Sequence, residues 1–495
     1  MKIEAPRPLQ GRRLLVAASG SIAAVKTPLL VSALVKAGAE VRCVITPSAS
    51  RLVSPVALAS LSRHPCLQDQ DQWDPSQPRP LHVELAEWAD LVVVAPLSAT
   101  SLARWTQGFG DGLLASLLLA CERPVVAASA MNTGMWGNAA VRRNWELLQR
   151  DERVLCLGPE PGLLACDRIG EGRMADPALI QLAVLHALQQ GSKERQLTRD
   201  WSGRSLLVTA GPTVEALDPA RMISNRSSGR MGVMLAQAAR WRGARVDLIH
   251  GPLQLPDAWL EGLCCHPVES AQAMESALID LQPGVDAVAM AAAVADLRRR
   301  GGALPEKPAK AALANVLSDQ METVPDLLAG LAERRPPGQV LLGFAALSGQ
   351  ADSLLERARH KLSAKKCDLL FANPIDQPNQ GFGSDLNGGW LLRRDGTQEQ
   401  CVPQCKLELA NRLLDELARQ LPALQATPPQ LYVVDHAAFS RPGRGRVALR
   451  PPPARRRAAC RPRARPGARP RAPCAAGGLR GPGGLWEGAC APWAP

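Results

Sequence analysis

Aromatic residues are scarce in this chain of 495 residues: Phe, Trp and Tyr together make up 3% of it, and Tyr432 is the single tyrosine. Any hydrophobic core must therefore be built mainly from Leu, Val and Ala. Apolar residues still account for 46% of the chain, which is the share of an ordinary globular protein. A chain of this length predicts two domains of roughly 200 residues each.

Long apolar runs are also missing. No segment approaches the roughly 20 apolar residues that a membrane span needs, and the polar stretch from Met1 to Arg13 does not resemble a signal peptide. The 13 cysteines include no CxxC pair, and the adjacent Cys264 and Cys265 have a poor geometry for bridging. These absences predict a reducing compartment and a cytoplasmic protein without a membrane partner.

The net charge of +12 is confined to the end of the chain. Residues 441–495 contain 13 Arg, one Glu and no Lys or Asp, so the rest of the chain is neutral. Residues 422–495 form a tail of Arg, Pro, Ala and Gly without periodicity, apart from a short apolar run at Leu431–Val434. Such a composition predicts disorder. A basic tail that binds nucleic acid is the alternative, and it depends on this segment alone.

The first 190 residues alternate short apolar runs with helical stretches. Apolar runs without a polar face predict parallel strands that are covered on both sides. The expected strands are Leu14–Ala18, Glu40–Ile45, Leu91–Ala95 and Val125–Ala128. This order predicts a doubly wound sheet with ligands at the carboxyl ends of the strands.

The polar segment 191–204 is interpreted as a linker, after which the same pattern begins again. The expected elements are strands at Leu206–Thr209, Arg245–His250, Val285–Met290, Val340–Phe344 and Asp368–Ala372, and a last helix near Lys406–Gln420. The predicted fold class is therefore α/β, with two Rossmann-like, three-layer, doubly wound domains at residues 1–190 and 205–421.

Small and hydroxyl-bearing residues follow the strands of the first domain. Ser19, Gly20 and Ser21 lie between a strand and a helix, where backbone N–H groups can bind a phosphate. Ser98 and Thr100 follow another strand, and a third is followed by Asn132. We expect these residues to form a polar-rimmed cleft.

Two further residues of this domain could act in chemistry. His82 stands ahead of the strand at Leu91, although a lone His is more often structural. Cys166 lies in a Gly-containing stretch, Leu164–Met174, which could act as a mobile lid. A thiol in a flexible polar loop is a candidate for proton transfer, whereas a lone Cys is usually an inert small hydrophobe.

Over roughly residues 10–190 these motifs resemble phosphopantothenoylcysteine decarboxylase, a flavodoxin-like member of the flavin-containing Cys decarboxylases. The resemblance implies FMN, which oxidises the substrate thiol so that the departing carboxylate has an electron sink, and then returns the hydride. It implies that His82 is the base, that Asn132 holds the substrate carboxylate, and that Cys166 protonates the enethiolate. The FMN-binding residues implied are Ser19, Gly20, Ser21, Ile22, Thr46, Ser98 and Thr100.

This domain departs from the family pattern beside Cys166, since Asp167 stands where Gly is usual. Its carboxylate could keep the thiol protonated, as a proton donor requires, or it could disturb the loop.

The second domain has a longer motif, from Thr209 to Gly232, in which Ser227 or Ser228 is a natural helix N-cap. Asp296 follows a buried strand, so it is expected at the ligand-binding edge. Lys361 and Lys365 are four residues apart and should share one helix face, either at a site or as a solvated stripe.

Over roughly residues 203–420 the chain resembles phosphopantothenate–cysteine ligase, and the order of the two domains is that of the bacterial bifunctional enzyme. The resemblance implies CTP and Mg²⁺, an acyl-cytidylate, and displacement of CMP by the amine of cysteine. Lys307 would serve the first half-reaction and Asn225 would hold the acyl-cytidylate. The nucleotide contacts implied are Met290, Ala291, Ala292, Asp296, Lys307, Pro325, Asp326, Leu327, Leu328, Phe344, Lys361 and Lys365. Val324 and Leu347-Ser348 depart from the usual residues beside these contacts.

Together the resemblances imply coenzyme A synthesis from 4′-phosphopantothenate, with ligation followed by decarboxylation. They also imply a homo-oligomer with trimeric decarboxylase and dimeric ligase domains. The alternatives are a chain with one live activity and a non-catalytic FMN-binding protein that regulates a partner.

Overall fold

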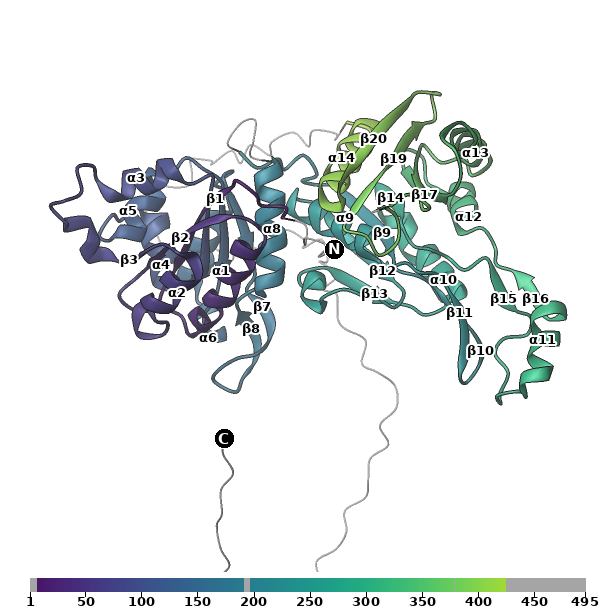
Figure 1. Cartoon of the computed structure of the whole chain (residues 1–495), viewed down its shortest axis with the longest axis horizontal. Coiled ribbons are helices and arrows are strands. Elements are labelled where there is room, and N and C mark those ends of the chain that lie inside the picture. The colour runs from purple at the N-terminus through teal and green to yellow at the C-terminus, as the bar shows by residue number, and fades with distance from the viewer. Residues whose placement is uncertain (1–6, 191–195, 379, 424–495) are drawn as a thin grey trace, which may run out of the picture. The chain divides into compact units, whose positions relative to one another are not determined.

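The computed structural model describes residues 7–190, 196–378 and 380–423 (Figure 1). The predicted tail lies outside the described residues except for Pro422 and Ala423, and so does the run Leu431–Val434. The first five residues of the predicted linker, 191–195, are outside them as well.

The first sheet has six strands in the order β3-β2-β1-β4-β5-β6, all paired in parallel. Its strands are β1 (Arg13–Ala18), β2 (Glu40–Ile45), β3 (Cys66–Leu67), β4 (Leu91–Leu97), β5 (Val125–Ser129) and β6 (Val154–Leu157). The chain moves outward from β1 to β3 and then crosses to β4, so the strand order reverses between β1 and β4. This reversal is the point at which doubly wound sheets open a ligand crevice.

Helices cover both faces of this sheet, as the apolar strands predict. Leu14 and Val16 of β1 pack into one core, and Leu15 and Ala17 pack into the other. The first core is covered by α1 (Thr27–Lys36), α2 (Pro55–Ser62) and α8 (Pro177–Gln190), and the second by α3 (Leu81–Trp88), α4 (Ala99–Gln107), α5 (Leu113–Ala120) and α7 (Ala139–Gln149). The chain also forms the 3₁₀ helices η1 (Ile22–Lys26), η2 (Ala49–Arg51) and η3 (Asp69–Trp73), the short helix α6 (Thr133–Trp136), and a hairpin of β7 (Glu160–Leu163) and β8 (Ile169–Arg173).

The second sheet has eight strands in the order β13-β12-β9-β14-β17-β18-β19-β20. They are β9 (Ser205–Ala210), β12 (Arg245–His250), β13 (Cys264–Pro267), β14 (Ala287–Met290), β17 (Val340–Leu347), β18 (Leu369–Pro374), β19 (Leu386–Arg393) and β20 (Gln398–Cys405). The first six are parallel and repeat the order of the first sheet, while β19 and β20 are added antiparallel. The corresponding crevice lies between β9 and β14.

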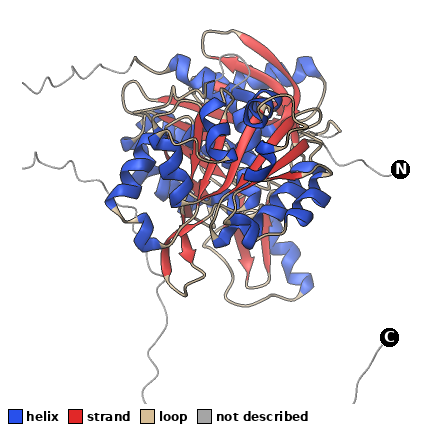
Figure 2. Ribbon diagram, turned by 90° about the vertical axis from the view of Figure 1, so that its left-hand side faces the viewer, coloured by secondary structure: helices blue, strands red, loops and turns tan. Residues whose placement is uncertain are grey.

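Helices also cover both faces of the second sheet, and Figure 2 shows strands running between helices. One face is covered by α9 (Arg230–Trp241) and α14 (Lys406–Gln420), the other by α10 (Ala271–Leu281), α12 (Leu327–Arg334) and α13 (Ala351–Ala364). Smaller elements are β10 (Val214–Asp218), β11 (Arg221–Ser224), η4 (Asp257–Leu260), η5 (Gln282–Gly284), β15 (Leu297–Arg299), α11 (Lys310–Asp319) and β16 (Met321–Thr323). The predicted α/β class with two doubly wound sheets is confirmed.

One expectation is wrong in detail. The N-cap of α9 is Gly229 rather than Ser227 or Ser228, and its φ of 80° lies in the left-handed region. A Cβ at Gly229 would lie 2.2 Å from a methyl carbon of Leu253, so the turn has no room for a side chain.

Among the described residues, no helix combines the length and the apolar character needed to cross a membrane.

Candidate functional site

Ser19 lies at the edge of the first sheet where the strand order reverses, between β1 and β4. The Ser19 hydroxyl donates to the carbonyl oxygen of Pro96 (2.8 Å) and accepts from the backbone N–H of Ser98 (2.7 Å). Ser19 therefore ties the end of β1 to the end of β4 and has no exposed surface for a ligand. Gly20 follows it where a Cβ would lie 2.5 Å from that of Ser48, so only glycine fits there.

The other predicted cofactor residues gather at the same edge of the sheet. Ser21 precedes η1, Thr46 follows β2, and its hydroxyl accepts from the N–H of Ala49 (3.3 Å). Ser98 caps α4 by accepting from the N–H of Ser101 (3.3 Å), and Thr100 is exposed on the first turn of that helix. Hydroxyls and a helix start suit a phosphate.

Ile22 gives this edge an apolar surface as well. Its side chain is 56% exposed, although isoleucine is among the residues that are most often buried. A flat apolar ring with a phosphate tail fits this combination of groups.

The structure brings Asn132 and Cys166 together although they are 34 residues apart. Asn132 is the N-cap of α6, where its Oδ1 accepts from the N–H of Gly134 (2.8 Å). Its Nδ2 donates to the Sγ of Cys166 (3.3 Å), at the exposed tip of the β7–β8 hairpin. A thiol and an amide that could orient a carboxylate thus face one another.

The backbone conformation of Asp167 explains why glycine would suit the position after Cys166. Its φ of 59° lies in the left-handed region, which glycine adopts freely and aspartate tolerates better than most residues. The turn is closed by two backbone bonds, from Leu164 N to Arg168 O (2.9 Å) and from Asp167 N to Leu164 O (3.0 Å). The departure from the family pattern therefore preserves the loop geometry.

His82 is not joined to this pair. It lies half-buried on the first turn of α3, and within the described residues it makes no hydrogen bond to Asn132 or Cys166.

A pocket of about 630 Å³ lies at the crevice of the second sheet. It is bordered by the first residues of α9 and α12, whose N–H groups favour anions. The predicted residues that line it are Asn225, Met290, Ala291, Ala292, Asp296, Pro325, Asp326, Leu327, Leu328, Phe344, Lys361 and Lys365. The sequence thus identified much of this wall.

Asn225 holds the floor of the pocket in place. Its Nδ2 donates to two backbone carbonyls, those of Ala293 and Val294, each at 3.0 Å. Thr209, fully buried at the end of β9, accepts from the N–H of Ala292 (3.1 Å). The loop after β14 is therefore fixed from β9 and from the residue that follows β11, and both of Asn225's amide protons are engaged.

Lys361 and Lys365, at the end of α13, line the same pocket. This position favours their interpretation as site residues over that of a solvated surface stripe. The Nζ of Lys365 lies 3.2 Å from a carboxylate oxygen of Asp326, the N-cap of α12. The pKa of Lys361 is lowered, first by burial and then by the neighbouring Lys365. A lysine pKa lowered in this way marks a cluster of cations whose mutual repulsion an anionic ligand would offset.

Two cations of the pocket were missed. Lys406 is 4% exposed, and its Nζ donates to the carbonyl of Gly381 (2.9 Å). Burial and the nearby Arg230 lower the pKa of Lys406 to about 8. Neither residue stands after a strand of the parallel sheet, so the search of strand ends could not find them.

Lys307 does not line the pocket. It is exposed in the loop between β15 and α11, which is held to the β10–β11 hairpin by a bond from Arg221 to the carbonyl of Pro308 (3.0 Å).

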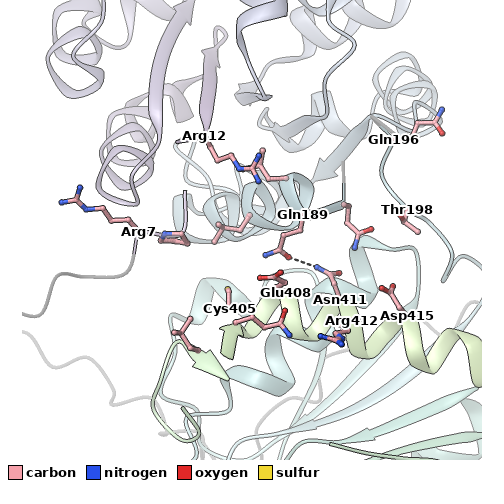
Figure 3. A pocket seen from close by; sticks show the side chains of 16 residues that line it. Arg7, Arg12, Gln189, Gln196, Thr198, Cys405, Glu408, Asn411, Arg412 and Asp415 are labelled. Carbon is pink, nitrogen blue, oxygen red and sulfur yellow. Dashed lines mark hydrogen bonds between the residues drawn. The ribbon is translucent and has the colours of Figure 1, made fainter. Parts of the chain in front are cut away.

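Two other features of the described residues carry none of the predicted chemistry. A cavity of about 990 Å³ is lined by residues such as Arg12, Gln189 and Asn411, the last two joined by a hydrogen bond (Figure 3). Asp247, Cys264 and His266 also come close together, with the Nε2 of His266 lying 3.0 Å from Asp247 Oδ1 and 3.5 Å from Cys264 Sγ.

Two family models match successive parts of the chain. Residues 2–189 match the flavoprotein family, and residues 201–421 match the DNA/pantothenate metabolism flavoprotein C-terminal domain. Among solved structures, the C-terminal domain of a coenzyme A biosynthesis bifunctional protein is 32% identical and covers 45% of this chain and 97% of that one (TM-score 0.36). The FMN-dependent cysteine decarboxylase SpaF is 31% identical and covers 37% and 98%, respectively (TM-score 0.32).

Full-length relatives match across both domains. The coenzyme A biosynthesis bifunctional protein of Bacillus subtilis (strain 168) is 36% identical over 414 residues, which are 83% of this chain and 97% of that protein. The protein of the same name from Escherichia coli (strain K12) is 38% identical over 413 residues, with the same coverage. The chain therefore belongs to the family of bifunctional coenzyme A biosynthesis proteins, and it is an enzyme with decarboxylase and ligase activities.

Proposed function

We propose that residues 1–190 form an FMN-dependent phosphopantothenoylcysteine decarboxylase, in which Asn132 holds the substrate carboxylate and Cys166 donates a proton. The observation that carries this proposal is the 3.3 Å contact between Asn132 Nδ2 and Cys166 Sγ. Bound FMN would supply the oxidation and reduction that side chains cannot perform. Gly20, Ser21, Ile22, Ser98 and Thr100, with Thr46 and the buried Ser19 behind them, would hold it. His82 is proposed as the base.

In the same way, residues 205–421 form a CTP-dependent phosphopantothenate–cysteine ligase. Lys361 and Lys365 offset the charge of the nucleotide phosphates, and the starts of α9 and α12 add backbone donors. Asn225 fixes the loop that faces the acyl-cytidylate, and Lys307 is proposed to serve its formation. Mg²⁺ is expected to accompany the nucleotide, with Asp296 and Asp326 as the acidic residues on the pocket wall.

Both reactions are tested together by supplying 4′-phosphopantothenate, cysteine, CTP and Mg²⁺ to the purified protein. We expect a yellow bound chromophore, release of CMP and pyrophosphate, and formation of 4′-phosphopantetheine. Replacing Cys166→Ser should leave amide formation intact and stop the second half after CO₂ loss, before the product is reduced. A Cys166→Ser protein that still yields 4′-phosphopantetheine at the wild-type rate would contradict the role given to the thiol.

The domains are proposed to assemble into homo-oligomers, with trimeric decarboxylase and dimeric ligase parts. Large apolar side chains are exposed on the first domain, among them Leu29 (65%) and Val56 (73%). Exposed apolar groups of this kind favour burial against another subunit. Sedimentation velocity of the whole chain tests this, and a monomer at micromolar concentration would contradict it.

A further inference from the structure

The hairpin that carries Cys166 is packed against the segment that carries Asn132. The backbone N–H of Met131 donates to the carbonyl of Gly172 in β8 (3.0 Å). A Cβ at Gly172 would lie 2.3 Å from the carbonyl oxygen of Met131, and one at Gly170 would lie 2.9 Å from the hydroxyl of Thr133. These two glycines let β8 approach as closely as it does.

Between the two glycines, the side chain of Glu171 in the hairpin contacts a residue of α6. The indole Nε1 of Trp136 donates to Glu171 Oε2 (2.9 Å). Hydrogen bonds to a charged acceptor are stronger than those between neutral groups. This bond therefore has the strength to fix a hairpin whose surface is otherwise mostly exposed.

Trp136 is itself held firmly. It is 6% exposed, it packs edge-on against Trp145 with ring centroids 5.4 Å apart, and the guanidinium of Arg142 lies 4.6 Å from its ring centre. An indole fixed on several sides provides a rigid donor, so the position of Glu171 is determined by the domain and not by the hairpin.

The geometry gives the hairpin two attachments to one short helix. Asn132 is the N-cap of α6 and Trp136 is its last residue. Asn132 meets Cys166 and Trp136 meets Glu171, five residues further along the hairpin. Sulfur is a weak acceptor, so the first attachment alone would hold the thiol poorly.

We propose that the Trp136–Glu171 hydrogen bond is a clasp that keeps Cys166 against Asn132, which makes Glu171 and Trp136 positioning residues for proton donation. The inference rests on the proposed role of Cys166. The hydrogen bond itself does not depend on that role, so the two can be tested apart.

The first measurement needs no turnover. Protein without substrate is treated with N-ethylmaleimide, and labelling of the Cys166 peptide is followed by mass spectrometry. Glu171→Ala should speed this labelling about fivefold because the thiol leaves Asn132, whereas Glu171→Gln, which keeps an acceptor oxygen, should stay near the wild-type rate. Glu146→Ala, at an exposed glutamate of α7, is the matched control.

The second measurement is the fate of the substrate. With phosphopantothenoylcysteine supplied, Glu171→Ala should release more decarboxylated product that has not been reduced, with KM within twofold of the wild type. Trp136→Phe removes the donor and should have a similar effect, and the double variant should be no worse than the more impaired single one.

Unchanged labelling and unchanged product ratio in folded Glu171→Ala would overturn the clasp. Faster labelling with an unchanged product ratio would confirm that the clasp holds the hairpin, and would show that Cys166 is not the proton donor.

Discussion

Replacing Asn225→Asp changes one NH₂ group into an oxygen, at a position where the structure requires a donor. Both protons of Asn225 Nδ2 go to backbone carbonyls, Ala293 O and Val294 O at 3.0 Å. Each such bond contributes about 0.5–1.5 kcal/mol net, so losing both costs about 1–3 kcal/mol. A carboxylate oxygen facing two carbonyl oxygens adds repulsion to that loss. The loop after β14 should therefore shift, and the pocket wall with it.

The expected result is loss of ligase activity with decarboxylase activity kept. Because about 1.4 kcal/mol corresponds to a tenfold change, amide formation should fall by about fivefold to 150-fold. CMP release from 4′-phosphopantothenate, CTP and cysteine measures the first activity, and CO₂ release from supplied phosphopantothenoylcysteine measures the second. The control is Asn315→Asp, which adds the same charge at an exposed position of α11 in the same domain.

Thermal unfolding completes the test. A loss of about 1–3 kcal/mol in a domain of this size lowers the midpoint of its transition by about 2–12 °C. If Asn225→Asp forms amide within twofold of the wild-type rate and its midpoint is unchanged, the two hydrogen bonds do not hold the loop, and the reasoning is refuted.

Three further predictions follow from single residues. The folded pKa of Lys406, about 8, is below its ordinary value of 10.5, so the unfolded chain binds more protons between these values and stability should rise with pH across that window. CTP affinity should fall as pH rises through about 8, and Lys406→Met should weaken CTP binding and remove both pH effects, as calorimetry and pH-dependent unfolding can show. Asp167→Val should destabilise the hairpin turn by about 1–2 kcal/mol because of the left-handed φ, whereas Asp167→Gly should not, and hydrogen exchange over residues 160–173 distinguishes them. Arg242→Leu should lower the free energy of unfolding by about 1–3 kcal/mol in a denaturant titration, because this buried guanidinium pairs with the partly exposed Asp200 (2.5 Å) and Asp415 (2.6 Å).

Much of the fold could be predicted because each parallel strand is a short apolar run. The strands Glu40–Ile45 and Arg245–His250 and the helix Lys406–Gln420 have the predicted bounds. β7 and β8 could not be predicted in this way, because Glu160–Leu163 and Ile169–Arg173 are mostly exposed and lack an apolar period. Their pairing depends on contacts with the segment after β5.

The same reasoning explains which site residues the sequence revealed. Asn225, Asp296 and Lys361 lie in motifs that the topology brings to one sheet edge, so their convergence was predictable. The hydrogen bonds of Asn225 were not, because the donor and its acceptors come from segments about 70 residues apart. The link between Trp136 and Glu171 is of the same kind, since neither residue marks a strand end.

The two sheets share a strand order, which accounts for the position of both sites. The second sheet also has two antiparallel strands, which account for the cation Lys406 that the sequence pattern did not reveal. In both sheets the order reverses beside the first strand, so β1–β4 and β9–β14 each open a crevice at their carboxyl ends. The second sheet then continues through two antiparallel strands, and α14 begins directly after β20. This return brings Lys406 to the pocket beside Arg230, and burial together with the charge of Arg230 lowers the pKa of Lys406. The pocket therefore has one pair of cations from α13 and another assembled by the added strands. A triphosphate requires several positive groups, so Lys406→Met tests whether the antiparallel extension belongs to the binding site or only completes the sheet.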